Sequence, residues 1–442
     1  MADAARDVAE RAVQLATSAG ADAVEATVSI DRRFHVEARG DIVSRLERST
    51  AKALHVRCFA AGRKATLVTS DFTPESLRDS LRRAIAAAAY VASDELAGLP
   101  ERFARDLPDL ELCDAAIEER DETGKVEEAL ELERAIRAFD ARIANSNGSH
   151  YSDAVTEIAI ANSAQFSGSY RSTRASRSSG PVAADGQFKR TGHYGTAARR
   201  LSELESLETV ARKAVVRAVE MFGARKPPTM RAPIIFERDV AASIFDDVFS
   251  ALSGANVAAG NSWLIGRIGE RIAAERVNVV DDGRLVGRLG SSPFDGEGVA
   301  TRRTPVIENG RLATFLCDTY YARRLGMQST GNSNGSGVGV NNLYLEAGTA
   351  SSDEIIAATP RGVLVVDTIG FATEHATGTY SRGARGFFIE NGEKAYPIDE
   401  FTIAGGYLEM LGAIDVIGND LRFDGAVTSP SFRVAEMTVS GN

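Results

Sequence analysis

Residues 370–406 read GFATEHATGTYSRGARGFFIENGEKAYPIDEFTIAGG, and this stretch predicts a β-hairpin preceded by a polar loop. The apolar run Phe387–Ile389 leads into Asn391-Gly392, which favours a type I′ turn because both central residues of that turn need positive φ. The chain then returns as a second strand over 394–403. The glycine-rich segment before the hairpin is expected to be a loop, and it contains Tyr380, Ser381, Arg382 and Arg385.

A polar loop mounted on a rigid hairpin is the usual arrangement of a binding surface. We therefore expect Tyr380, Ser381, Arg382 and Arg385 to contact a substrate or a partner. An ordinary β-meander with a solvated loop would have the same pattern, since hairpins are common.

The length and composition indicate a globular protein of more than one domain. The chain has 442 residues, of which 44% are hydrophobic and 25% charged, and domains commonly hold roughly 100–200 residues. The net charge of −10 argues against direct nucleic-acid binding, which needs a basic face. No apolar run is long enough to span a membrane, and the charged residues Asp3 and Arg6 lead us to expect no signal peptide. Three widely spaced cysteines fit a reducing compartment, so we expect a cytoplasmic protein.

The first half of the sequence predicts helices packed on an antiparallel sheet. The period changes from 3.6 to two at Ala23, and turn residues at Gly40-Asp41 and Ala61-Gly62 return the chain twice. Thr73-Pro74 is typical of a helix start. Expected helices cover 3–19, 74 to about 91, 125–141 and 204–222, and expected strands lie within 23–68 and 143–188. The second of these stretches is expected to be interrupted at 145–148 (NSNG) and at 178–181 (SSGP).

The paired prolines Pro227-Pro228 mark the expected boundary, because a helix cannot continue through them. The predicted organisation is an N-terminal α+β domain over 1–222, a linker over 223–231 and a C-terminal β-rich domain over 232–442. The second domain is expected to be mainly antiparallel with hairpins, with one helix over 240–252. The fold class is therefore α+β with two domains.

The segment Gly331–Gly339 (GNSNGSGVG) is too rich in glycine and polar residues for a strand, so it is expected to be a surface loop. Such a loop could cradle an anion or a peptide backbone, and Asn334 is its candidate contact residue. It lacks the Lys-Ser/Thr of a phosphate-binding loop, and a flexible loop without a ligand is the preferred interpretation.

The histidines form no zinc motif in the sequence. Zinc hydrolases commonly place two histidines close together on one element, whereas the five histidines here are widely spaced. His375, which follows Glu374, is the only one that we consider for a site, and a hydrogen-bonded loop histidine is the ordinary alternative.

The sequence also shows no complete set of residues for nucleophilic or carboxylate catalysis. No G-x-S-x-G motif occurs, and Ser381 has no adjacent base, although Ser381-Arg382 could hold a carboxylate or a peptide carbonyl. Asp246-Asp247 could act as an acid–base pair, but consecutive helical residues diverge by about 100°, which favours a solvated face. From the residues alone we find no complete active site.

Several motifs together resemble one known family. They are GADAVE at 20–25, RCFAAGRKATL at 57–67, FTPESL at 72–77, TGTYSRGA at 377–384, GF at 386–387, ENG at 390–392, YP at 396–397 and TIAG at 402–405. This long pattern resembles the TldD/PmbA family, and specifically its PmbA (TldE) branch, over nearly the whole chain.

The resemblance implies a two-domain α+β subunit that pairs with a homologous TldD-type subunit. The expected heterodimer is a cytoplasmic zinc metallopeptidase that cuts unfolded peptides, including peptide-antibiotic precursors and small unfolded proteins, inside a closed chamber. The TldD branch holds zinc through an H-E-x-x-x-H helix and a cysteine near the C-terminus.

In this chain the resemblance places Phe245, Asp246 and Ser250 at the positions of that motif, and residues 423–433 contain no cysteine. The metal site is therefore expected to be lost. We expect no catalytic residue and no cofactor in this chain, with zinc held by the TldD-type partner.

Two other functions remain open at this point. The family's older description as a modulator of DNA gyrase would make the chain a stand-alone regulatory binding protein. A self-sufficient hydrolase using Glu374, His375 or Ser381 is the third hypothesis. Because Arg382 lies in the expected loop, Arg382→Ala is predicted to weaken peptide processing and to leave the fold intact.

Overall fold

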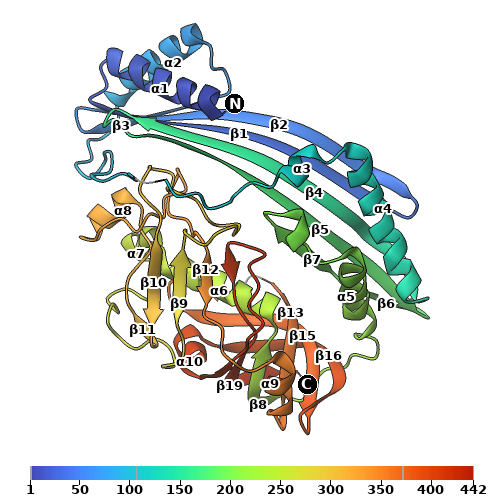
Figure 1. The fold of residues 1–442 in the computed structure, drawn as a ribbon. Helices are drawn as coiled ribbons and strands as arrows, with labels where there is room; N and C mark the ends of the chain where they lie inside the picture. Colours follow the sequence, from blue (N-terminus) through green and yellow to red (C-terminus); the bar gives the residue numbers. More distant parts are fainter. Residues whose placement is uncertain (1, 106, 371–372, 442) are drawn as a thin grey trace.

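The structure, a computed structural model, describes residues 2–105, 107–370 and 373–441. The chain has mixed helices and sheets, as the α+β prediction requires. Its most prominent feature is a long, curved, seven-stranded antiparallel sheet in the first half, which arches over the C-terminal half (Figure 1). Helices α1 and α2 lie at one end of this sheet, and α4 and α5 lie toward the other.

The N-terminal sheet has the strand order β3-β2-β1-β4-β5-β6, and β7 also pairs with β5. Its longest strands have 17 to 20 residues, so they span about 55–65 Å at about 3.3 Å per residue. The strands are β1 (Ala23–Arg39), β2 (Ile42–Ala60), β3 (Arg63–Thr69), β4 (Ile143–Asn162), β5 (Ser167–Asp185), β6 (Phe188–Thr191) and β7 (Tyr194–Ala198).

The helices of the first half cover one face of this sheet. Alternate residues of β1, including Val24, Val28 and Phe34, are buried under α1, α2 or α4. The helices are α1 (Ala2–Ser18), α2 (Pro74–Ala88), α3 (Ala115–Glu119), α4 (Glu122–Phe139) and α5 (Leu207–Val219), with a 3₁₀ turn at Leu201–Glu203. Thr73 is the N-cap of α2 and Pro74 its first residue, as predicted, but the Thr73 side chain makes no capping hydrogen bond.

The predicted interruptions of the 143–188 strands are different in the structure. The segment Asn145–Gly148 forms a bulge within β4, where the register with β5 shifts between Ser146 and Ser149. The second predicted break, at 178–181, does not occur, because β5 continues through it and pairs with β4 and β7.

Beyond residue 229, five strands pair in a closed ring, β13-β8-β19-β16-β15 and back to β13. A second sheet has the order β11-β10-β9-β12-β18. The strands are β8 (Met230–Phe236), β9 (Val279–Asp282), β10 (Arg303–Glu308), β11 (Arg311–Leu312), β12 (Leu343–Leu345), β13 (Arg361–Ile369), β14 (Thr373–Glu374), β15 (Thr379–Glu390), β16 (Glu393–Gly406), β17 (Ile414–Ile417), β18 (Val427–Thr428) and β19 (Phe432–Ser440).

Helix α6 packs between these sheets and supplies much of the largest apolar core, which includes Ile244, Phe245 and Val248. The helices of this half are α6 (Arg238–Leu252), α7 (Gly254–Ala258), α8 (Thr319–Arg324), α9 (Ser352–Ala357) and α10 (Tyr407–Gly412). None of the helices formed by the described residues is both long and apolar enough to cross a lipid bilayer.

The hairpin predicted at Asn391-Gly392 is confirmed, but the loop predicted before it is wrong. Asn391 has φ 54° and Gly392 φ 77°, as a type I′ turn requires. Residues Tyr380, Ser381, Arg382 and Arg385, however, all belong to β15. Phe371 and Ala372, also in the predicted loop, lie outside the described residues.

Close strand packing explains why glycines occur inside β15. A Cβ atom on Gly386 would overlap the carbonyl oxygen of Leu364 on the adjacent strand β13. The register of β13 with β15 also shifts at this point, between Val365 and Asp367. The glycine therefore permits a close strand approach at a bulge, where the sequence pattern suggested a flexible loop.

We predict that Gly386→Ala lowers the free energy of unfolding by about 3 kcal/mol, because the added methyl group must displace a strand backbone. Urea denaturation measures this change. Gly412→Ala is the matched control, since a Cβ at that position meets nothing within 4 Å. Equal stabilities of the two variants would contradict the packing explanation.

Candidate functional site

A cluster of polar and aromatic side chains joins α6 to the start of β15. Arg382 donates to the Asp247 carboxylate with its Nη2 atom at 2.6 Å from Oδ2, and the Tyr407 hydroxyl donates to the same oxygen at 2.6 Å. The Arg382 and Asp247 side chains are only 11% and 12% exposed. We call Asp247, Arg382, Tyr407, Tyr380 and Trp263 the α6–β15 cluster.

Stacked aromatic rings complete this cluster. The Trp263 and Tyr407 rings are stacked with centroids 5.7 Å apart, and Tyr380 meets Tyr407 edge to face at 5.7 Å. Tyr380 is fully buried, and burial raises the pKa of its hydroxyl. Gly378 has φ +73°, and a Cβ there would lie 2.8 Å from Trp263, so the turn before β15 packs directly on this ring.

The two aspartates of α6 therefore have different environments. Asp246 is exposed, in agreement with the predicted solvated face, whereas Asp247 points into the cluster and the prediction is wrong for it. Partial desolvation and then the Asp247 charge raise the pKa of Asp246, while Arg382 and His375 oppose that rise. A carboxylate already bound by Arg382 and Tyr407 is a structural anchor for the helix.

The remaining predicted contact residues are dispersed. Arg385 faces the Asp367 carboxylate at 3.5 Å, and Ser381 lies opposite Ala404 on β16. His375 is half-buried, and its Nδ1 atom has no hydrogen-bond partner among the described residues. The structure thus brings Arg382 and Tyr380 together at α6. Ser381 faces the other side of the strand, where we identify no base among the described residues.

The predicted Gly331–Gly339 loop is a loop, but only its tip is at the surface. Asn334 is exposed, and its Oδ1 atom accepts from the backbone N–H groups of Ser336 and Gly337 at 3.0 and 2.9 Å. Asn332 is buried and donates to Asp281 at 2.7 Å. These bonds fix the conformation of the loop, so Asn334 stabilises a turn within it.

Sequence profiles of one family match three parts of the chain. They describe PmbA/TldA metallopeptidase domain 1 at residues 24–88, the central domain at 116–222 and the C-terminal domain at 229–441. The Metalloprotease PmbA of Escherichia coli O157:H7 is 32% identical over 445 residues, which cover 99% of this chain and 97% of that protein. The chain belongs to the PmbA/TldD family.

Solved structures of similar proteins have the same fold. A protein of Bacteroides thetaiotaomicron, named as a candidate modulator of DNA gyrase, is 26% identical with a TM-score of 0.92, over 99% of this chain and 98% of that one. TldE of Thermococcus kodakarensis is 23% identical with a TM-score of 0.88, over 98% of this chain and 100% of that one, and this likeness concerns the fold alone.

The residues of this PmbA/TldD-family chain do not fit a zinc ion at the α6 position. The Phe245 ring is fully buried and meets Phe432 edge to face with centroids 6.1 Å apart, and a phenyl ring has no lone pair to donate. The Ser250 hydroxyl contacts the backbone oxygen of Asp246 at 3.4 Å. In the described ranges, no three His, Cys, Asp or Glu side chains around α6 lie close enough to share an ion.

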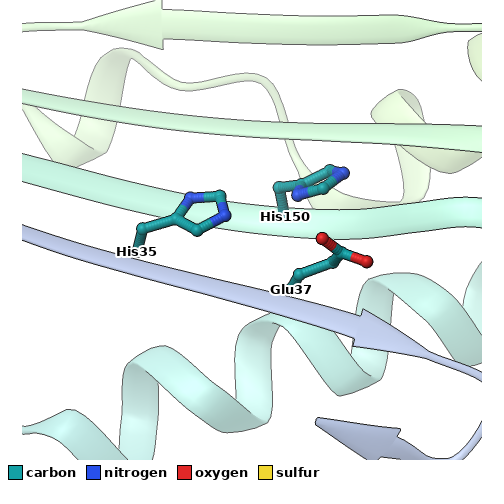
Figure 2. A group of neighbouring side chains, drawn as sticks. All are labelled: His35, Glu37 and His150. Carbon is teal, nitrogen blue, oxygen red and sulfur yellow. The ribbon is translucent and has the colours of Figure 1, made fainter. Parts of the chain in front are cut away.

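Sequence reasoning missed one group of three metal-ligand side chains. His35, Glu37 and His150 come together on the adjacent strands β1 and β4 (Figure 2). The two histidines are remote in sequence, and only the strand register brings them side by side. A signal was present in the i, i+2 spacing of His35 and Glu37, which places both on one face of a strand.

We predict that Arg382→Ala lowers the free energy of unfolding by about 3 kcal/mol, because the substitution leaves Asp247 buried without its arginine. This replaces the expectation that the fold would be unaffected. Arg385→Ala, on the same strand, is the control and is expected to lose less than about 1 kcal/mol, since Asp367 is 54% exposed. If urea denaturation showed a similarly small loss of unfolding free energy in both variants, Arg382 would not be required for the fold, as first expected.

Proposed function

We propose that this chain is the non-catalytic, TldE-type subunit of a heteromeric TldD–TldE zinc metallopeptidase. The observation that carries the proposal is the fully buried Phe245 side chain on α6, at the position where the family resemblance places a zinc ligand. A phenyl ring has no lone pair with which to coordinate a metal, and this ring packs on Phe432 in the core. The peptidase zinc is then supplied by a homologous TldD-type partner.

The proposed substrates are extended, unfolded peptides, among them peptide-antibiotic precursors and small unfolded proteins, in the cytoplasm. Extended peptides bind by adding a strand to a free sheet edge. The segment 42–53 of β2 provides such an edge, since β3 pairs only with residues 54–60 and no other described strand adjoins the rest. Ile42, Val43 and Leu46 on this segment are exposed apolar residues that could contact a peptide side chain.

We predict that the purified chain cleaves no unfolded peptide, and that a co-purified TldD-type homologue restores chelator-sensitive cleavage. The measurement is hydrolysis of an unfolded reporter peptide by each subunit alone and by the mixture, with native mass spectrometry for complex formation. A homologue that is equally active without this chain would contradict the proposal.

Capture from the source cell tests the second candidate function. Regulation of DNA gyrase is suggested by the name of the Bacteroides thetaiotaomicron relative. Recovery of a topoisomerase with no homologous subunit would support that function and contradict the peptidase assignment.

We predict that Leu46→Asp raises the KM of the complex for an unfolded peptide at least roughly tenfold, which corresponds to about 1.4 kcal/mol of binding energy. The residue is 48% exposed, so the fold should be unaffected. Val286→Asp, at a 53% exposed position outside the sheet, is the control. An unchanged KM, or a loss of complex formation in native mass spectrometry, would exclude this edge as the peptide site.

A further inference from the structure

The group on β1 and β4 has the composition of a metal site. His35 and Glu37 are two residues apart on β1, and Glu37 is directly opposite His150 on β4. One nitrogen or oxygen atom from each of the three side chains lies within 4.8 Å of the other two. All three side chains are half-buried, and Figure 2 shows them side by side on neighbouring strands.

The geometry needs only a small movement to hold one ion. Zn–N distances of about 2.0–2.1 Å place two tetrahedral ligands about 3.4 Å apart. The imidazole rings are stacked with centroids 5.5 Å apart and planes at 26°, so a side-chain rotation that turns their nitrogens toward Glu37 closes the site.

Two hydroxyl groups already orient the ligands. His35 Nδ1 lies 2.7 Å from the Ser152 hydroxyl, which directs the Nε2 atom of the same ring toward an ion. The Ser44 hydroxyl donates to Glu37 Oε1 at 2.8 Å. Metal-bound histidines and carboxylates are commonly held by such partners, and an accidental contact of two surface histidines does not require them.

A glycine makes room for the carboxylate. Gly148 has φ +108°, and a Cβ atom there would lie 2.8 Å from Glu37 Cγ. The turn-like backbone of β4 at this point therefore allows the Glu37 side chain to lie beside His150. This is an independent sign that the position of Glu37 is fixed by its surroundings.

We infer that His35, Glu37 and His150 bind one divalent transition-metal ion, with Zn²⁺ as the best match. Two imidazoles and one carboxylate suit Zn²⁺ and disfavour Mg²⁺ and Ca²⁺, which prefer oxygen ligands throughout. Three protein ligands leave a coordination position for water or for a group from a bound chain. The inference replaces the expectation that this chain holds no metal.

This site is separate from the family's peptidase position on α6. Phe34, Val36 and Tyr151 alternate with the three ligands and pack against Ala129 of α4, so the ligands project from the opposite face of the sheet. That is the face on which Glu25 and Arg57 reach Glu297 of the C-terminal half. A metal ion here would join β1 to β4, and the inference does not rest on the proposed peptidase function.

Zinc titration of the full-length, metal-stripped chain against a chromophoric chelator tests the site. We expect one high-affinity Zn²⁺ per chain, a loss of at least roughly 100-fold in affinity for His35→Ala and for His150→Ala, and a smaller loss of roughly tenfold for Ser152→Ala. His55→Ala, at an exposed histidine of the same sheet, is the matched control and should bind as the unaltered chain does.

Two further measurements distinguish a metal-binding site from a pair of stacked histidines that binds no metal. Co²⁺ in place of Zn²⁺ should give visible bands without a thiolate charge-transfer band, because none of the three ligands is a cysteine. Zinc should raise the unfolding midpoint of the unaltered chain and of His55→Ala, and should not raise that of His150→Ala. Equal zinc affinity in all these proteins, or no binding above that of a His35→Ala, His150→Ala double variant, would overturn the inference.

Discussion

The Asp247 carboxylate, bound by Arg382 and Tyr407 at 2.6 Å each, fixes helix α6 against the start of β15. A helix anchored in this way has little freedom to rotate, so its other faces are determined as well. Phe245 then points into the core and Asp246 into solvent. The Asp247 carboxylate of α6 is thus already neutralised by its ion pair with Arg382.

The two halves of the chain differ in how their strands are paired. In the C-terminal half the strands β13, β8, β19, β16 and β15 pair in a ring, whereas the long N-terminal sheet has a free edge on β2. Exposed edges are usually protected, and charged residues such as Arg45 and Glu47 serve that purpose here. A protected but accessible edge is suited to a transient extended ligand.

Local sequence signals predicted local structure well. The Asn391-Gly392 turn, the proline-led start of α2 and the alternation of β1 all depend on near neighbours, and each was found where expected. The α+β class followed from the same periodicities. The glycines of β15 led to the wrong prediction of a loop. In the sequence, a glycine required by close strand packing cannot be distinguished from a glycine of a loop.

The candidate sites depend on distant pairings, which explains why they were harder to predict. Arg382 was predicted to lie in a loop and to contact a ligand, whereas it lies on β15 and pairs with Asp247. Asp247 was interpreted as solvated, since nothing local to α6 indicates what packs on it. His35 and His150 could be joined only through the β1–β4 register. A single sequence contains the residues of such a site without stating which strands are adjacent.

The most direct test of the account is zinc analysis and peptide hydrolysis on the isolated His35→Ala, His150→Ala double variant. This protein lacks the inferred sheet site and retains an unaltered α6 region. The account predicts no stoichiometric zinc and no cleavage of an unfolded peptide by this variant alone. One tightly bound zinc per chain together with chelator-sensitive cleavage would contradict the account, because the metal would then have to reside at another position that supports catalysis.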